Sequence, residues 1–172
     1  MKIFSTVIVA ISTLFTASAV AQTCSNITEE EVIAAQKQWG DGIVAIGEAD
    51  DPEAAALNHL DTLYGYDLGE VLFKPTLAAA NQFRGTKDEA LSYFVTGVVE
   101  EDEGFAITPF TQVRYENENI MTYCETALAM GNYYFTTTDG NEIKVEYSFG
   151  YVKDDDGQLK IVLHHSSAPY QP

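Results

Sequence analysis

The spacing of apolar residues divides the chain into a helical first part and a strand-rich second part. Thr28 stands three residues before Glu31, as in a capping box, and predicts a helix from Thr28 to about Ala49. Within this range the apolar residues recur at helical spacing: Val32, Ile33, Trp39, Ile43 and Ile46. Pro52 predicts a second helix to about Leu63, because proline at the first helical position loses no hydrogen bond.

The middle of the chain predicts shorter elements. Residues 71–76 form a short strand or extended segment that Pro75 interrupts, which leaves the Thr76 side chain free to face a cavity. Thr86 caps a short helix that contains Tyr93. A tyrosine in such a helix is more often a core residue than a catalytic one.

From Phe105 onward, long β-type runs alternate with turn signals. The predicted strands are residues 105–116, 120–137, 142–153 and 158–167. The segments between them are short and rich in Asn, Asp and Gly, as hairpin turns are: 117–119, 139–141 and 154–157. Helices followed by an antiparallel meander predict an α+β domain, in which the helices pack on the concave face of the sheet.

The last strand carries the polar groups of greatest interest. Side chains alternate between the two faces of a strand, so Leu159, Ile161 and Leu163 share a face with His165 and Ser167. The other face carries Lys160, Val162, His164 and Ser166. This count places His165 and Ser167 at the end of an apolar face, as in a binding pocket. A core histidine and a strand-end serine with no chemical role are the alternative.

Residues 1–21 resemble a secretory signal peptide. Lys2 precedes an apolar run, and small residues close the segment at Ala19-Val20-Ala21. The apolar run is short for a membrane span, so we expect an exported protein, periplasmic or secreted, with no membrane partner. Residues 22–172 are then of the size of one domain.

The chain has two cysteines, Cys24 and Cys124. In an oxidising compartment an even pair predicts one disulfide, which would tie the N-terminal segment to a later strand. Two free buried thiols are the alternative.

Charge and motif content disfavour several functions. The net charge of −17 disfavours nucleic acids and anionic membranes as partners. Zinc needs three or four converging ligands, and His164 and His165 point to opposite faces of one strand. The sequence has no Gly-x-Ser-x-Gly elbow and no glycine-rich phosphate loop, and its acidic clusters lack EF-hand spacing.

Several segments together resemble the iota-class carbonic anhydrases. They are Leu-Phe-Lys-Pro-Thr at 72–76, Gln-Phe-Arg at 82–84, Ser-Tyr-Phe at 92–94, Gly-Phe-Ala-Ile at 104–107 and His-His-Ser-Ser at 164–167. The C-terminal segment also resembles the end of the calcium/calmodulin-dependent kinase II association domain. Both resemblances imply the cone-shaped SnoaL-like fold of the nuclear-transport-factor-2-like superfamily.

The resemblance implies a lyase that hydrates carbon dioxide reversibly to bicarbonate and a proton, in a pocket between helices and sheet. The family's catalytic residues would fall on Thr76, Tyr93, His165 and Ser167, with the three hydroxyl groups also binding substrate. The expected partners are carbon dioxide, bicarbonate and a second copy of the chain in a homodimer. No cofactor is expected, and dependence on zinc or manganese stays an alternative.

Two further functions stay open. One is a non-catalytic module that binds a small ligand or oligomerises, as association domains do. The other is a SnoaL-like isomerase or cyclase, which would need an acidic base inside the pocket. No Asp or Glu stands clearly at an inward-facing strand position.

Overall fold

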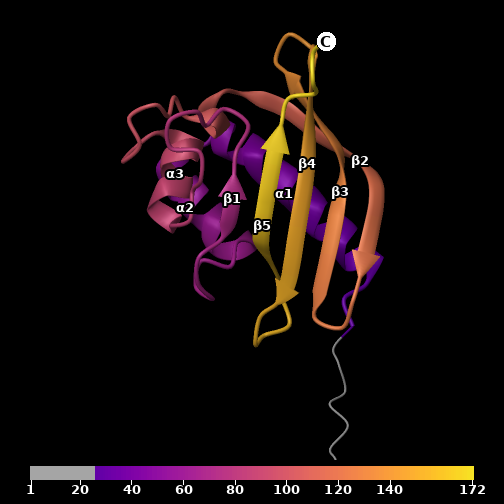
Figure 1. Ribbon diagram of the computed structural model, residues 1–172. Coiled ribbons are helices and arrows are strands. Elements are labelled where there is room, and N and C mark those ends of the chain that lie inside the picture. Colours follow the sequence, from indigo (N-terminus) through magenta and orange to yellow (C-terminus); the bar gives the residue numbers. More distant parts are fainter. Residues whose placement is uncertain (1–25) are drawn as a thin grey trace, which may run out of the picture.

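Helices and strands form two layers in the computed structural model, which describes residues 26–172 (Figure 1). The helices are α1 (Glu29–Glu48), α2 (Pro52–Leu63), α3 (Lys87–Val95) and a short 3-10 helix, η1 (Phe105–Ile107). The strands are β1 (Leu72–Lys74), β2 (Phe110–Thr122), β3 (Thr126–Thr137), β4 (Glu142–Lys153) and β5 (Leu159–Ser167). The α+β prediction is confirmed.

The helix starts follow from local hydrogen bonds. At α1 the Glu31 N–H donates to the Thr28 hydroxyl and the Thr28 N–H donates to the Glu31 carboxylate, so the predicted capping box is present. Thr86 and Glu89 repeat this arrangement at α3. Pro52 occupies the first turn of α2.

The sheet has the strand order β1-β5-β4-β3-β2. Strands β2 to β5 form the predicted antiparallel meander. Strand β1 pairs with β5 in parallel, which adds a parallel edge to the predicted antiparallel meander. The cause is the path of the chain: the segment after α2 enters alongside β5 and runs in the same direction.

The predicted turn at 117–119 is wrong. Strand β2 continues through it, with a bulge between Asn117 and Asn119, and the hairpin turns at 123–125. Gly131 lies opposite the bulge, where an added Cβ would approach the Glu116 carbonyl oxygen to 2.1 Å. Glycine therefore lets the two backbones approach each other. The start of the predicted strand at 105–107 is η1 instead.

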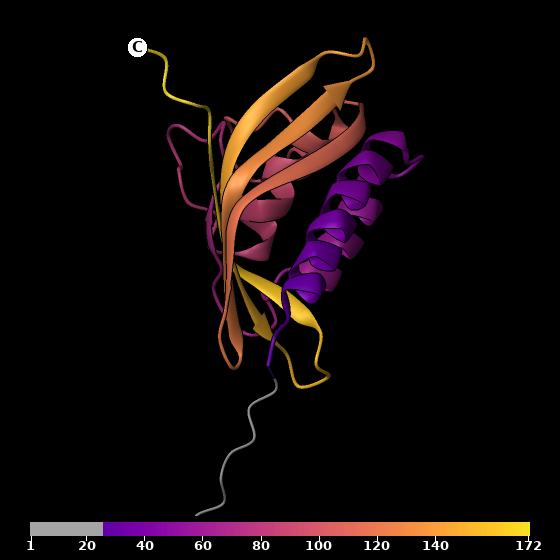
Figure 2. The same ribbon diagram turned by 90° about the vertical axis from the view of Figure 1, so that its right-hand side faces the viewer.

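The sheet curves around the helices, as Figure 2 shows edge-on. Aromatic side chains from both layers fill the interior, with the Trp39 ring of α1 in contact with Tyr133, Phe135 and Phe149 of the sheet. The opposite face of the sheet has no helix over it in the described part of the chain (Figures 1 and 2). We refer to these two faces as inner and outer.

Two sequence predictions involve residues outside the described range. The predicted signal peptide, 1–21, lies there entirely, and so does Cys24. The Cys24–Cys124 disulfide therefore stays a prediction. Between residues 26 and 172, no helix is both long and apolar enough to cross a membrane.

Candidate active site

A cavity of about 340 Å³ lies between the helices and the inner face of the sheet. Most of its lining is aromatic or aliphatic: Trp39, Phe73, Leu77, Phe94, Phe105, Phe110, Phe135, Ile143, Val145 and Ala168. The polar side chains of the lining include Thr76, Tyr93, Tyr133, His164 and Ser166. The cavity is thus an apolar space with a small set of polar groups, the usual composition of a small-molecule site.

The structure brings Thr76 and Tyr93 together, as expected. Thr76 follows β1 and Tyr93 lies on α3, and both line the cavity. The Tyr93 hydroxyl takes a backbone hydrogen bond from Leu77, the residue after Thr76. Their part in catalysis stays a prediction.

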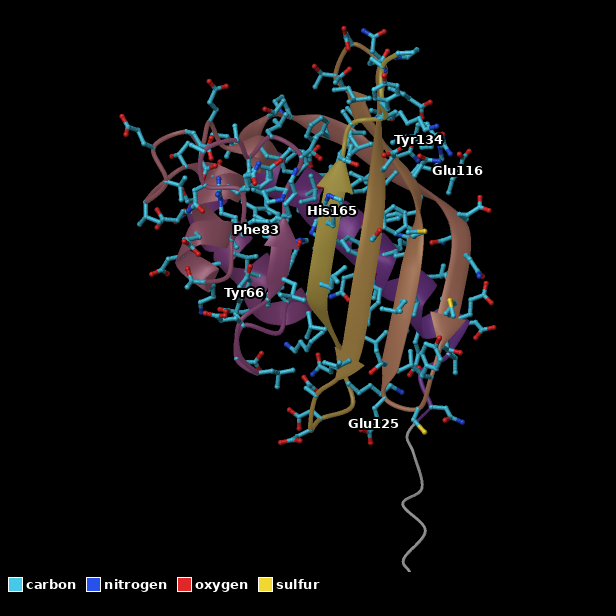
Figure 3. The ribbon with its side chains drawn as sticks, viewed as in Figure 1. Tyr66, Phe83, Glu116, Glu125, Tyr134 and His165 are labelled. Carbon is cyan, nitrogen blue, oxygen red and sulfur yellow. The ribbon has the colours of Figure 1, made fainter. Side chains whose placement is uncertain are left out.

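The prediction that His165 and Ser167 face the interior is wrong. His165 is exposed on the outer face, as Figure 3 shows with its label on β5. Ser167 donates a hydrogen bond of 3.1 Å to the Glu146 carboxylate on the same face. Both residues border a shallow depression there, away from the cavity.

A bulge in β5 is the physical reason for this error. Tyr151 pairs with Ile161 and Gly150 pairs with Leu163, so Val162 is an extra residue between the two pairs. One extra residue reverses which side chains face inward along the rest of the strand. Ile161 remains in the core, and beyond the bulge the inward residues are His164 and Ser166.

Sequence reasoning therefore missed His164 and Ser166 as cavity residues. The signal that could have found them is Gly150, a glycine within a strand, which often marks a bulge. The His-His-Ser-Ser sequence could not reveal the error, because a shift of one residue still places one histidine and one serine on the inner face.

His164 is packed between aromatic rings. Its ring stacks on Phe73 with centroids 4.7 Å apart and meets the Phe149 ring edge-on at 4.3 Å. The Tyr64 hydroxyl lies 2.8 Å from Nδ1, and the Tyr133 hydroxyl lies 3.4 Å from Nε2. Burial lowers the pKa of His164 well below 6.5, with a smaller effect from the nearby His165. The imidazole is therefore neutral at neutral pH.

The hydroxyl groups form a chain beside His164. Thr76 Oγ1 lies 2.9 Å from Ser166 Oγ, and the Tyr133 hydroxyl is hydrogen-bonded to Ser166. Burial raises the pKa of Tyr93 to about 12 and raises that of Tyr133 further. Both phenols therefore keep their protons, and the polar end of the cavity carries hydrogen-bonding groups without net charge.

A buried ion pair holds the loops that carry these groups. Arg84 is fully buried and donates to the Asp102 carboxylate at 2.8 Å and to Glu101 at 3.4 Å. The Glu101 carboxylate accepts three backbone N–H groups, from Ala79, Ala80 and Asn81. The loop after β1 is thus fastened to the loop after α3.

Metal-ligating side chains do not gather at this site. Across residues 26–172, no group of three His, Cys, Asp or Glu side chains is arranged to hold a metal ion. The histidine nearest the cavity has Nδ1 hydrogen-bonded to Tyr64. The donors present suit a neutral small molecule or a weakly held anion.

Comparison with known proteins agrees with the fold and assigns the chain to a family. The sequence profile of the family "metal-independent carbonic anhydrase" matches residues 30–168. A metal-independent carbonic anhydrase from Nostoc sp. (strain PCC 7120 / SAG 25.82 / UTEX 2576) is 43% identical over 154 residues, which cover 84% of this chain and 75% of the relative.

Solved structures give the same result. The cyanobacterial iota-carbonic anhydrase crystallised with bicarbonate matches with a TM-score of 0.83 and 38% identity, covering 91% of this chain and 100% of that one. An association-domain protein from Xanthomonas campestris matches with a TM-score of 0.54 and 21% identity, covering 94% of this chain and 100% of that one. This second match shows only that the fold is shared.

The family profile matches most of the chain. The sequence identity to the Nostoc enzyme, 43%, is high enough to show that the two proteins belong to one family. The absence of a metal requirement in that family agrees with the sequence prediction that no cofactor is needed. The chain is an enzyme of the metal-independent, iota-class carbonic anhydrase family.

Proposed function

We propose that this enzyme hydrates carbon dioxide reversibly to bicarbonate and a proton in the cavity on the inner face of the sheet. The observation that carries the proposal is the cluster of Thr76, Tyr93, His164 and Ser166 around one aromatic cavity. The bicarbonate in the crystals of the 38% identical cyanobacterial enzyme supports it. His164 and Ser166 take the places that the sequence assigned to His165 and Ser167.

The lining suits the substrate better than the product. Carbon dioxide is uncharged and weakly polar, so aromatic walls accept it without the desolvation cost that an ion incurs. Bicarbonate is charged, and the polar end of the cavity offers it hydrogen bonds without a buried cation. Its binding is therefore weak enough for release to water.

The chemical step places a water molecule on the carbon of carbon dioxide. The oxygen of the water forms the new C–O bond, one C=O electron pair moves onto an oxygen, and the proton leaves the water. The hydroxyls of Tyr93 and Ser166 donate to the oxygens on which negative charge grows. Such hydrogen bonds are stronger in a dry cavity than in water.

The proton leaves through hydroxyl exchange. Thr76 and Ser166 are hydrogen-bonded at 2.9 Å, so one hydroxyl can accept a proton while it passes its own to the next oxygen. Thr76 is half-buried, and Leu77 beside it is exposed at the cavity edge. The relay thus ends at bulk water.

Stopped-flow measurement of carbon dioxide hydration, before and after exhaustive chelation, tests the function. The chain offers a matched pair of serines, so Ser166→Ala and Ser167→Ala are compared. We expect turnover that survives chelation, falls by about 100-fold in Ser166→Ala and changes by less than about twofold in Ser167→Ala. Equal losses in both variants would contradict the assignment to the inner face.

We also propose that the enzyme is an exported homodimer. The outer face of the sheet exposes large apolar side chains, including Leu72, Leu128 and Met130, and a second copy would cover them. Sedimentation of wild type and Met130→Glu tests this, with the variant expected to be monomeric. Export predicts that the protein recovered outside the cytoplasm begins near Gln22, which mass spectrometry measures.

A further inference from the structure

Tyr64 is a buried tyrosine that lies behind the cavity. Its side chain is 1% exposed and is not part of the cavity lining. Its hydroxyl lies between the Trp39 indole and the His164 ring, at 2.9 Å from Trp39 Nε1 and 2.8 Å from His164 Nδ1. The three side chains form one hydrogen-bonded chain from α1 to β5.

The chemistry of the indole fixes the direction of this chain. Trp39 Nε1–H can only donate, so the Tyr64 oxygen accepts from it. The Tyr64 hydroxyl then has one hydrogen of its own to place. Within residues 26–172 its only other hydrogen-bond partner is His164 Nδ1.

Two arrangements of the His164 ring are then conceivable. If Nδ1 carried the proton, Tyr64 would accept two hydrogen bonds and its own O–H would be buried without an acceptor, which is unfavourable. If Nδ1 is unprotonated, it accepts from Tyr64 and every donor in the chain has an acceptor. The second arrangement places the ring proton of a neutral imidazole on Nε2.

Nε2 is the nitrogen on the cavity side. It lies 3.4 Å from the hydroxyl of Tyr133, and Tyr133 and His164 both line the cavity. An N–H at this position can donate to Tyr133 or to a substrate oxygen, and it cannot take a proton from water. The Tyr133 hydroxyl is also hydrogen-bonded to Ser166.

We propose that Tyr64, oriented by Trp39, is a positioning residue that holds His164 in the Nε2–H tautomer, so that His164 serves the cavity as a hydrogen-bond donor and not as a base. This inference rests on the proposed function only for its catalytic consequence, because the tautomer itself is a property of the protein without substrate. The role differs from the proton relay that a histidine near neutral pH usually performs.

Long-range ¹H–¹⁵N spectra of protein labelled at histidine test the tautomer directly. In the wild type, we expect His164 Nε2 to resonate as a protonated nitrogen and Nδ1 as a bare nitrogen. A protonated Nδ1, or two protonated nitrogens at neutral pH, would overturn the proposal. His59→Gln and His165→Gln each remove one histidine from the spectra and so assign the remaining signals.

Tyr64→Phe removes the hydroxyl while keeping the ring. We expect the two His164 nitrogens to shift toward the averaged values of mixed tautomers, and turnover to fall about tenfold, the equivalent of one hydrogen bond. The matched control is Tyr66→Phe, because Tyr66 stacks on Tyr64 but donates to the Arg84 carbonyl instead. The control should keep the wild-type His164 shifts and turnover.

The outcomes separate the two proposals. Wild-type protein without carbonic anhydrase activity, but with the Nε2–H tautomer, would reject the proposed function and leave the tautomer assignment standing. Unchanged His164 shifts in folded Tyr64→Phe would overturn the role of Tyr64 whatever the activity. If Tyr64→Phe does not fold, the wild-type spectrum alone decides whether Nδ1 or Nε2 carries the proton.

Discussion

The two faces of β5 carry the same residue types in different surroundings. His164 and Ser166 point into an aromatic cavity, and their neighbours His165 and Ser167 point toward the uncovered face of the sheet. Inward, every polar atom must find a partner in the protein, so geometry fixes what each group can do. Outward, Ser167 donates to the Glu146 carboxylate and His165 is exposed. The comparison shows that burial, more than residue type, determines the chemistry that this strand offers.

The largest expected difference between the two faces of β5 is the effect of removing each histidine on the stability of the fold. His164→Ala removes a ring packed between Phe73 and Phe149 and leaves the Tyr64 hydroxyl without its acceptor, so we expect a loss of about 3 kcal/mol in the free energy of unfolding. His165→Ala should change it by less than about 0.5 kcal/mol. Urea unfolding of both variants measures the difference, and similar losses would contradict the placement of the two rings.

Acid should also reveal the two buried histidines, His59 and His164. Burial lowers the pKa of His59 to about 3 and lowers that of His164 well below 6.5. The unfolded chain therefore binds more protons than the folded one below pH 6.5, and stability falls as the pH decreases through this range. Each such histidine contributes a slope of up to about 1.4 kcal/mol per pH unit.

His59→Leu tests this slope. Between about pH 6 and pH 5, we expect the variant to lose less stability with acid than the wild type, by up to about 1.4 kcal/mol per pH unit. The wild type measured in the same series of buffers is the control. Thermal unfolding at several pH values measures both, and an unchanged slope in His59→Leu would show that His59 is not held neutral by the fold.

The smallest expected difference concerns single hydrogen bonds to the two serines. Thr76→Val breaks the bond to Ser166 on the inner face, and Glu146→Gln alters the bond from Ser167 on the outer face. We expect losses of about 1 kcal/mol for the first and less than about 0.5 kcal/mol for the second. Chemical denaturation resolves the two if each variant is compared with wild type in the same buffer.

Local sequence signals predicted the helices well. Capping residues Thr28 and Thr86 and the proline of α2 act over a few residues, so α1, α2 and α3 begin where the sequence indicates. The parallel pairing of β1 with β5 depends on residues far apart in the chain, and no local pattern reports it.

The candidate site was predicted in part. Thr76 and Tyr93 were placed by family segments, which do not depend on counting along a strand. His164 and Ser166 were missed because we assigned inward and outward side chains by strict alternation. A bulge reverses that alternation for every residue after it. Val162 is apolar like its neighbours and gives no sign that it is an extra residue. The error therefore lay in one backbone irregularity and not in the choice of motif.

The Arg84 ion pair couples the two loops beside the cavity. Arg84 is paired with Asp102, and Glu101 beside it holds three amides of the loop that follows Thr76. Separating these loops would leave a cation and a carboxylate uncompensated in the interior, which is strongly unfavourable. The two loops should therefore exchange their amide hydrogens as one cooperative unit. The edge of the cavity that these loops form should therefore open or stay closed as one piece, and not loop by loop.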